Sequence, residues 1–269
     1  MNAETPRAAE LNLPQAFLLL ATNDHDGKPE VPMFALRTTL AGAILAELEL
    51  IGAIGLQGKH VRARGTAPQT DLQHELELIR GKYRPHTPKR WVSMLEGRAE
   101  MQRVYEGMAA RGIVEHVGEK HLGVFRSVRY PEKDHAPEAA LLEKIQAALG
   151  VAPADAGTPS DAAAADAGTP DTEAPAAAVP EAATPESAAT DAAAPAAGTP
   201  APATPDATAP DARTKALIAL LQAAGLLSKL VPAADKVRAS ELAKDYWPSR
   251  AVEDELRMIR LAEEEEPGI

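Results

Sequence analysis

The chain has 269 residues, no cysteine and a formal net charge of −11. Without cysteine it forms neither a disulfide framework nor a thiolate zinc site. No apolar run reaches the roughly eighteen residues that argue for a spanning helix, and the N-terminal "MNAETPRAAELNLPQ" lacks the basic-then-apolar layout of a signal peptide. We therefore expect a cytoplasmic protein, either free or peripheral on the cytoplasmic membrane face.

Hydrophobic periodicity and turn signals predict a mainly helical region over residues 10–150. Thr87 before Pro88 indicates a helix start, Thr70 with Gln73 resembles a capping box, and Gly112 indicates a helix end. In chain order we expect a helix in 11–21, a turn at 23–28, a helix over 34–51, a β-hairpin at 54–65, helices over 70–80, 88–95 and 98–111, a second hairpin in 113–128 turning near Gly118, and a helix over 137–149.

The predicted helix around residues 40–51 is apolar on nearly every side and rich in small residues. An all-round apolar helix belongs in a buried position, where its small side chains let neighbouring helices approach closely. Glu47 and Glu49 near its end argue against insertion into lipid. We expect this helix at the centre of a soluble core.

Residues 151–212 form a low-complexity segment of Ala, Pro, Thr and Asp, in which "DAGTP" occurs twice. The segment has ten acidic residues and no Lys or Arg, so it accounts for most of the net charge. Prolines and the lack of large apolar side chains predict a disordered insertion. It is either a spacer or docking tether, or a tolerated insertion in a surface loop.

Helical periodicity returns after this segment, in 214–231, 239–247 and 250–266. These apolar faces need a partner, and the region before the insertion supplies one. We expect residues 10–150 plus 213–262 to form one domain, a mainly α, compact multi-helix bundle around the buried central helix with small β-hairpins. An independent C-terminal helical module is the alternative.

No catalytic motif stands out, and we expect neither an enzyme nor a cofactor. None of the seven histidines sits in an HExxH arrangement; His116 and His121 meet across the second hairpin in one interpretation, but solvated histidines explain them better. "NDHDGK" at 23–28 resembles a calcium loop, yet its acidic positions are wrong and a plain turn is preferred. No metal site is predicted.

Basic side chains cluster between residues 80 and 98. The predicted anion-binding residues are Lys82, Arg84, Lys89, Arg90 and Arg98, with Arg80 and the hairpin cations Lys59, Arg62 and Arg64 nearby. Helix N-terminal amides beside Lys89 and Arg90 also favour anions. The cluster is either a solvated basic face or a surface for phosphate groups.

The order of segments resembles the Golgi phosphoprotein 3 family, in a divergent, prokaryotic-type form. The matching stretches are "LNLPQAFLLLATNDHDGK", "LAGAILAELELIGAIGL", "TAPQTDLQHELELIR", "PKRWVSML" and "ARGIVEHVGEKHLGVFRSVRYP". The resemblance implies a mainly helical domain with a projecting β-hairpin, and peripheral membrane binding through phosphatidylinositol 4-phosphate. In eukaryotic members it also implies an adaptor role in retaining Golgi glycosyltransferases.

The headgroup site that the resemblance implies is poorly kept here. The family's gripping tryptophan falls near Pro32 and its three arginines fall at Ala41, Arg98 and Met101, so one of four side chains matches. Since paired arginine–phosphate contacts give such a site its selectivity, we expect degraded inositide selectivity and general anionic-lipid attraction.

The second hairpin, residues 113–127, presents Glu119 and Lys120 at its predicted tip, and it is expected to pack on a protein client rather than insert into lipid. The 151–212 tether is the other candidate for client binding. A soluble protein–protein interaction scaffold without lipid binding is the alternative function. Nucleic-acid binding is not expected, because no helix carries the adjacent basic and amide side chains needed for base readout.

Overall fold

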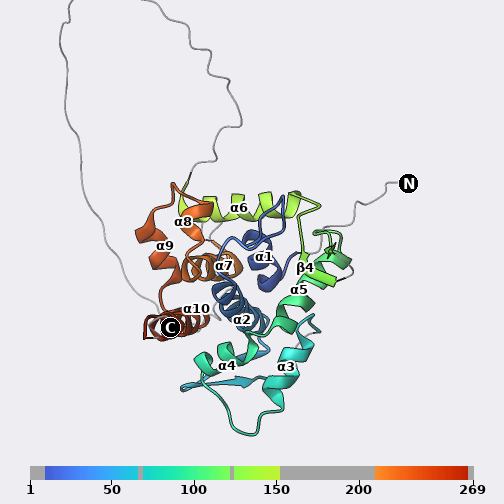
Figure 1. The fold of residues 1–269 in the computed structure, drawn as a ribbon. Coiled ribbons are helices and arrows are strands. Elements are labelled where there is room, and N and C mark those ends of the chain that lie inside the picture. Colours follow the sequence, from blue (N-terminus) through green and yellow to red (C-terminus); the bar gives the residue numbers. More distant parts are fainter. Residues whose placement is uncertain (1–9, 66–68, 122–123, 152–209, 266–269) are drawn as a thin grey trace, which may run out of the picture. The chain divides into compact units, whose positions relative to one another are not determined.

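The computed structural model describes residues 10–65, 69–121, 124–151 and 210–265; the remaining residues, which hold nearly all of the predicted insertion, are the grey trace in Figure 1. Within the described residues the predicted mainly helical class with two small hairpins is confirmed. The elements are α1 (Leu13–Leu20), α2 (Met33–Leu50), β1 (Ile54–Gln57), β2 (His60–Ala63), α3 (Gln73–Arg80), α4 (Pro88–Leu95), α5 (Arg98–Ala110), β3 (Val117–His121), β4 (Val124–Arg129), α6 (Ala136–Leu149), α7 (Ala212–Ala223), α8 (Leu227–Leu230), α9 (Lys236–Ala243) and α10 (Trp247–Glu265).

Helix α2 occupies the middle of the fold and contacts α1, α4, α5, α7 and α10 (Figure 1). Every residue from Thr38 to Leu48 is buried, as the all-round apolar pattern predicts. Gly42 is needed for the close approach of α10, since a Cβ there would lie 2.2 Å from Cγ2 of Val252. Small side chains on α2 therefore set how closely its neighbours pack.

Helix α1 begins with a complete capping box and is buried along its whole length. Asn12 Oδ1 accepts the N–H of Gln15 at 3.0 Å, and Gln15 Oε1 accepts the N–H of Asn12 at 3.4 Å. These bonds satisfy backbone donors that a helix start leaves without intrahelical partners. The cap lets α1 begin inside the core without the cost of unpaired amides.

Helices on both sides of residues 152–209 contribute to one hydrophobic core. The carboxylate of Glu47 in α2 accepts hydrogen bonds from Arg213 Nη1 at 2.5 Å and Nη2 at 3.0 Å, and from the N–H of Leu13 at 2.9 Å. Trp247 Nε1 donates to Glu49 at the end of the same helix. The two glutamates that argued against membrane insertion thus anchor the C-terminal helices. That both parts unfold as one domain stays a prediction.

Two predicted helix boundaries are wrong. Thr70 and Gln73 form no capping box, because Leu72 occupies the N-cap position and Gln73 is the first helical residue; Thr70 Oγ1 accepts the N–H of Leu72 at 3.2 Å instead. The predicted helix 214–231 is two helices, α7 and α8. Gly225 separates them with a φ of +77°, a left-handed conformation that glycine adopts without strain.

The predicted turn near Gly118 is also wrong, because Gly118 lies within β3 and pairs with Val128 of β4. The chain reverses between His121 and Val124, so the predicted tip residues Glu119 and Lys120 belong to β3. His116 lies outside β3 and stacks on Tyr130 with ring centroids 5.3 Å apart, which does not support the interpretation that pairs it with His121.

Candidate anion-binding surface

The start of α4 places two of the predicted basic residues at a helix N-terminus. Thr87 caps the helix by accepting the N–H of Arg90 at 3.4 Å, and Pro88 occupies the first turn. The side chain of Trp91 is 1% exposed and anchors α4 to the core. Arg90 therefore stays at the surface beside backbone N–H groups, where the helix dipole also favours an anion.

A shallow hollow of about 200 Å³ lies beside Trp91 and is lined by three cationic side chains from three elements. Arg62 comes from β2, Arg80 from the end of α3 and Lys82 from the loop after it. No carboxylate is among the residues that line the hollow. Two guanidinium groups and an ammonium group around one depression suit an oxyanion such as a phosphate.

Backbone contacts hold this arrangement. The N–H of Val61 in β2 donates to the carbonyl oxygen of His86 at 2.9 Å, which fastens the loop before α4 to the first hairpin. The His86 ring also meets the Trp91 ring edge-on, with centroids 5.6 Å apart. Arg80 Nη2 donates to the carbonyl oxygen of Gly65 at 3.3 Å. The hollow is thus a product of the packing of β2, α3 and α4 together.

The loop at 82–84 adds exposed cations and an exposed aromatic ring to this side of the hollow. Lys82 and Arg84 are exposed, and Tyr83 between them is 97% exposed. A tyrosine ring has an apolar body and a polar tip and is enriched where one side of a contact is apolar and the other is wet. We call Arg62, Arg80, Lys82, Arg84 and Arg90 the basic surface.

Of the five predicted residues only Lys82 lines the hollow, and two others, Lys89 and Arg98, are left out of the basic surface. The ammonium nitrogen of Lys89 lies 3.8 Å from Glu255 Oε2 of α10, so its charge is partly balanced. Arg98 is exposed but begins α5, beyond the far end of α4, and eight helical residues span about 12 Å. Arg62 and Arg80 line the hollow together with Lys82. Both arginines are visible in the sequence as basic residues, but their spacing along the chain did not indicate that they lie close together.

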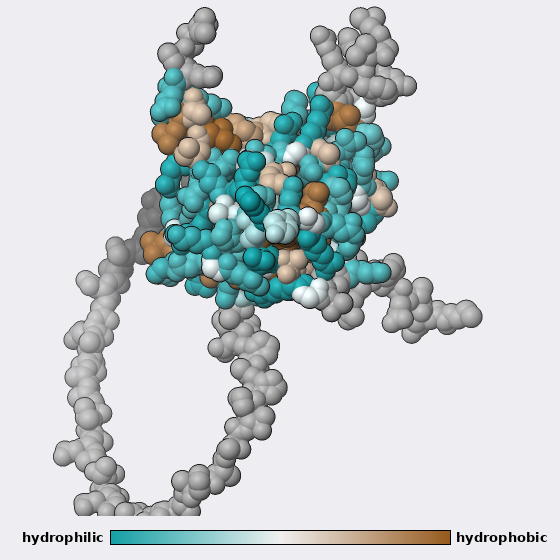
Figure 2. Space-filling model, turned by 90° about the horizontal axis from the view of Figure 1, so that it is seen from below, coloured by the Kyte–Doolittle hydropathy of each residue, from teal (hydrophilic) through white to brown (hydrophobic). Residues whose placement is uncertain are grey.

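Figure 2 turns the molecule so that the side bearing α3, α4 and the first hairpin in Figure 1 comes into view. This face is predominantly hydrophilic, with apolar residues scattered across it. Such a face suits superficial, charge-driven contact better than deep insertion of apolar side chains.

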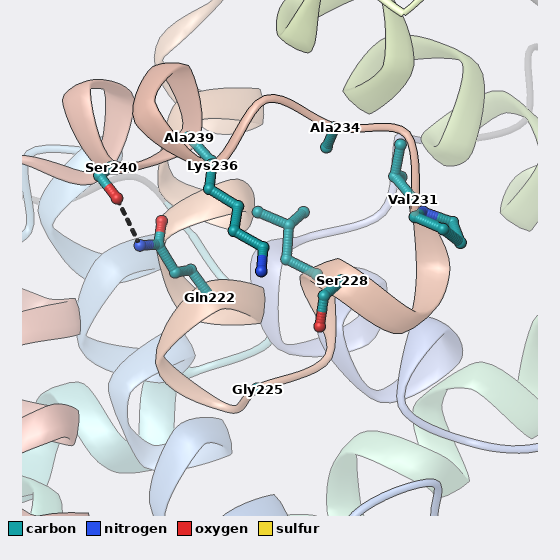
Figure 3. Close-up of a pocket in the computed structure, with 10 residues that line it drawn as sticks. Gln222, Gly225, Ser228, Val231, Ala234, Lys236, Ala239 and Ser240 are labelled. Carbon is teal, nitrogen blue, oxygen red and sulfur yellow. Dashed lines mark hydrogen bonds between the residues drawn. The ribbon is translucent and has the colours of Figure 1, made fainter.

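A second cavity, of about 290 Å³, lies among α7, α8 and α9 (Figure 3). Its wall is largely apolar, and Gln222 Nε2 donates to Ser240 Oγ at 3.1 Å on one side. The Lys236 side chain extends into the space between Gln222 and Ser228. Its lining residues include no carboxylate or histidine that would act as a base for a serine nucleophile, so the basic surface is the better candidate site.

The family model described as Golgi phosphoprotein 3 (GPP34) matches residues 13–259. The chain belongs to the Golgi phosphoprotein 3 family. No curated protein matches it. The matched range includes both the helices before the insertion and most of those after it.

In this Golgi phosphoprotein 3 family member, the four positions predicted for headgroup side chains differ in accessibility. Ala41 is 0% exposed within α2, and Met101 packs against the core from α5. Pro32 is the N-cap residue of α2, and Arg98 is exposed at the start of α5. A cation therefore stands at one of these positions only.

Among the described helices, none has both the length and the apolar character to cross a membrane.

Proposed function

We propose that this protein is a non-enzymatic, peripheral adaptor that attaches to anionic membrane lipids through the basic surface. Membership of the Golgi phosphoprotein 3 family supports the class of function. The observation that carries the proposal is the exposed Lys82–Tyr83–Arg84 segment beside the hollow lined by Arg62 and Arg80. Cations and an interfacial aromatic side chain on one face are what a headgroup layer binds.

The strength of the attachment follows from the number of unbalanced cations. Each basic residue near an anionic leaflet contributes about 1 kcal/mol, and salt screens the attraction within roughly a Debye length of 8–10 Å. The five cations of the basic surface then contribute on the order of 5 kcal/mol. Lys89 adds less, because Glu255 lies beside it.

We also propose that selectivity for phosphatidylinositol 4-phosphate is degraded. Three of the four headgroup positions implied by the family carry Pro32, Ala41 and Met101, which offer no side-chain hydrogen-bond donor to a phosphate. A protein client is expected to bind through the hairpin 113–127 or the tether 151–212. We propose a cytoplasmic location for the protein, because the cytoplasmic leaflet offers anionic lipids to a peripheral protein.

Flotation of the full chain with vesicles tests the proposal. The vesicles contain phosphatidylcholine alone, or phosphatidylcholine with either phosphatidylserine or phosphatidylinositol 4-phosphate at matched surface charge. We expect binding to both anionic mixtures to similar extents, no binding to phosphatidylcholine, and loss of binding as salt rises from about 0.1 M to about 0.5 M. A strong preference for the phosphoinositide would overturn the degraded selectivity.

Charge reversal locates the surface. Lys82→Glu, Arg84→Glu and Arg90→Glu together should weaken binding by more than roughly 100-fold, since three contributions of about 1 kcal/mol are removed and three repulsive charges are added. The matched control reverses three exposed cations elsewhere, Lys236→Glu, Lys244→Glu and Arg250→Glu, and should retain most binding. The single substitution Arg98→Glu tests whether Arg98, the one predicted headgroup position that carries a cation, contributes to vesicle binding. Equal losses in the two triple variants would refute the location.

The soluble interaction scaffold remains the second candidate, because the face in Figure 2 is predominantly hydrophilic. It is favoured if the full chain binds no anionic vesicles at low salt while forming a stable complex with a purified protein client.

A further inference from the structure

Three elements bring an aspartate, a glutamate and a histidine to one place on the side of the molecule formed by α1 and α6. Asp24 belongs to the turn after α1, Glu132 follows β4, and His135 is the N-cap residue of α6. One potential donor atom from each side chain lies within 4.8 Å of the others. No sequence motif indicated this cluster, since Asp24 is far in the chain from Glu132 and His135, which are three residues apart.

The turn that carries Asp24 is fixed against the segment that carries Glu132. The N–H of Glu132 donates to the carbonyl oxygen of Asp24 at 3.1 Å. Gly27 has a φ of +64°, and a Cβ there would lie 2.6 Å from the backbone nitrogens of Tyr130 and Pro131. Only glycine permits this approach, so the backbone positions Asp24 and Glu132 independently of any ligand.

Other polar groups of the turn have partners within the turn. Asn23 Oδ1 accepts the N–H groups of His25 and Asp26 at 3.1 and 3.2 Å. Asp26 Oδ2 lies 2.7 Å from Lys28 Nζ. The Asp24 carboxylate does not take part in this local network and lies near Glu138 in the first turn of α6.

The Glu132 side chain is the strongest sign of a ligand. It is only 2% exposed, and its Oε2 contacts His135 Nδ1. Its other oxygen, Oε1, is buried and has no hydrogen-bond donor among the described residues. A buried acceptor without a donor costs about 1–3 kcal/mol, and more when it is charged. Such an oxygen beside another carboxylate and an imidazole is arranged to receive a cation.

Glu138 in the first turn of α6 adds a third carboxyl group near Asp24 and Glu132. Carboxyl oxygens and one imidazole therefore surround the buried Glu132 oxygen that has no donor within the described part of the chain.

We propose that Asp24, Glu132 and His135 bind a divalent transition-metal ion of the zinc or manganese type. One imidazole nitrogen with carboxylate oxygens suits these borderline ions, whereas Mg²⁺ and Ca²⁺ prefer oxygen alone. Bonds of about 2.0–2.2 Å to zinc place ligand pairs about 3–4 Å apart, so a small inward movement of the exposed His135 ring completes the site. Glu138 is placed to act as a fourth ligand. A bound ion would clamp the turn after α1 to the start of α6.

Isothermal titration calorimetry of the full chain with ZnCl₂, MnCl₂ and CaCl₂ in a non-coordinating buffer tests the site. We expect one tight Zn²⁺ or Mn²⁺ site per chain, weaker Ca²⁺ binding, and a higher thermal unfolding midpoint with the preferred ion. Asp24→Asn and His135→Gln should each lower the affinity by at least about 10-fold. His135 has a side chain that is 67% exposed, so its variant is expected to fold normally.

Matched controls lie in the same turn. His25→Gln and Asp26→Asn remove the same chemical groups outside the cluster and should leave the affinity unchanged. Glu132→Gln should abolish tight binding, with circular dichroism verifying that the variant is folded. Absence of tight binding would overturn the proposal. So would unchanged binding in His135→Gln, because the chain has six other histidines and many carboxylates that hold metal ions adventitiously.

Discussion

Replacement of Arg213 by alanine tests whether the helices after the insertion share one cooperative core with those before it. Arg213 precedes the buried stretch of α7 and donates two hydrogen bonds to the Glu47 carboxylate in the central helix. The Glu47 side chain is 6% exposed and that of Arg213 is 30% exposed. The substitution leaves a buried carboxylate with one donor among the described residues, the N–H of Leu13.

The expected loss follows from these contacts. Removal of one partner from a fully buried ion pair destabilises a protein by about 3–5 kcal/mol, because the other charge stays buried without compensation. Arg213 is partly exposed, so water reaches the Glu47 carboxylate after the truncation. We therefore expect the free energy of unfolding to fall by about 2–3 kcal/mol. With a urea dependence of about 2 kcal/mol per molar, the unfolding midpoint moves down by roughly 1 M.

Urea unfolding of the full chain, followed by far-ultraviolet circular dichroism and by tryptophan fluorescence, measures this loss. Trp91 reports on α4 and Trp247 on α10, so coincident transitions indicate one cooperative domain. Arg250→Ala is the control, because Arg250 is 66% exposed and lies 3.5 Å from an equally exposed Asp245; it should cost less than about 0.5 kcal/mol. A loss below 0.5 kcal/mol for Arg213→Ala, or two separate transitions, would refute the reasoning.

Two other substitutions probe the core and its pH dependence. Gly42→Ala should lower the free energy of unfolding by about 1–2 kcal/mol, because overpacking against Val252 outweighs a gain in helix propensity of about 1 kcal/mol. Gly107→Ala, where the nearest atom is 3.6 Å from the new Cβ, should raise the free energy of unfolding in the same urea assay. Burial raises the pKa of Glu96, which accepts a hydrogen bond from Thr38 Oγ1 at 2.9 Å and feels the charge of Glu255. The folded protein thus holds this proton more tightly than the unfolded chain, so the stabilisation is present in acid and is lost as pH rises through the raised pKa. Glu96→Gln should raise the unfolding midpoint at pH 7 and match the wild type below about pH 4; a stabilisation that grows in acid would contradict the sign.

Local chemistry predicted the elements whose signals lie within a few residues. Thr87 and Pro88 indicated the start of α4, and the all-round apolar pattern indicated that α2 is buried. Local signals failed where two neighbouring residues could each serve as the helix cap or the hairpin turn. Leu72 rather than Thr70 precedes α3, and the pairing of Gly118 with Val128 moves the chain reversal further along. Thr70 Oγ1 accepts the N–H of Leu72 instead of capping the helix, and the register of β3 on β4 set the position of the reversal.

The candidate sites show the same difference between what composition indicates and what the tertiary structure brings together. The basic character of residues 80–98 was evident from composition, but the hollow required β2 to bring Arg62 beside Arg80 and Lys82. Glu255 of α10 lies beside Lys89, and the length of α4 separates Arg98 from the other cations. The cluster of Asp24, Glu132 and His135 gave no motif, because the fold brings the turn after α1 to the segment between β4 and α6.

The sequence by itself determined the helical class, the buried central helix and the excess of positive charge near α4, since hydrophobic periodicity and composition act along the chain. Only the tertiary structure decided which charges meet, which are paired and which carboxylates converge. Those outcomes depend on distances of a few ångströms between segments far apart in sequence, and close packing around α2 sets these distances.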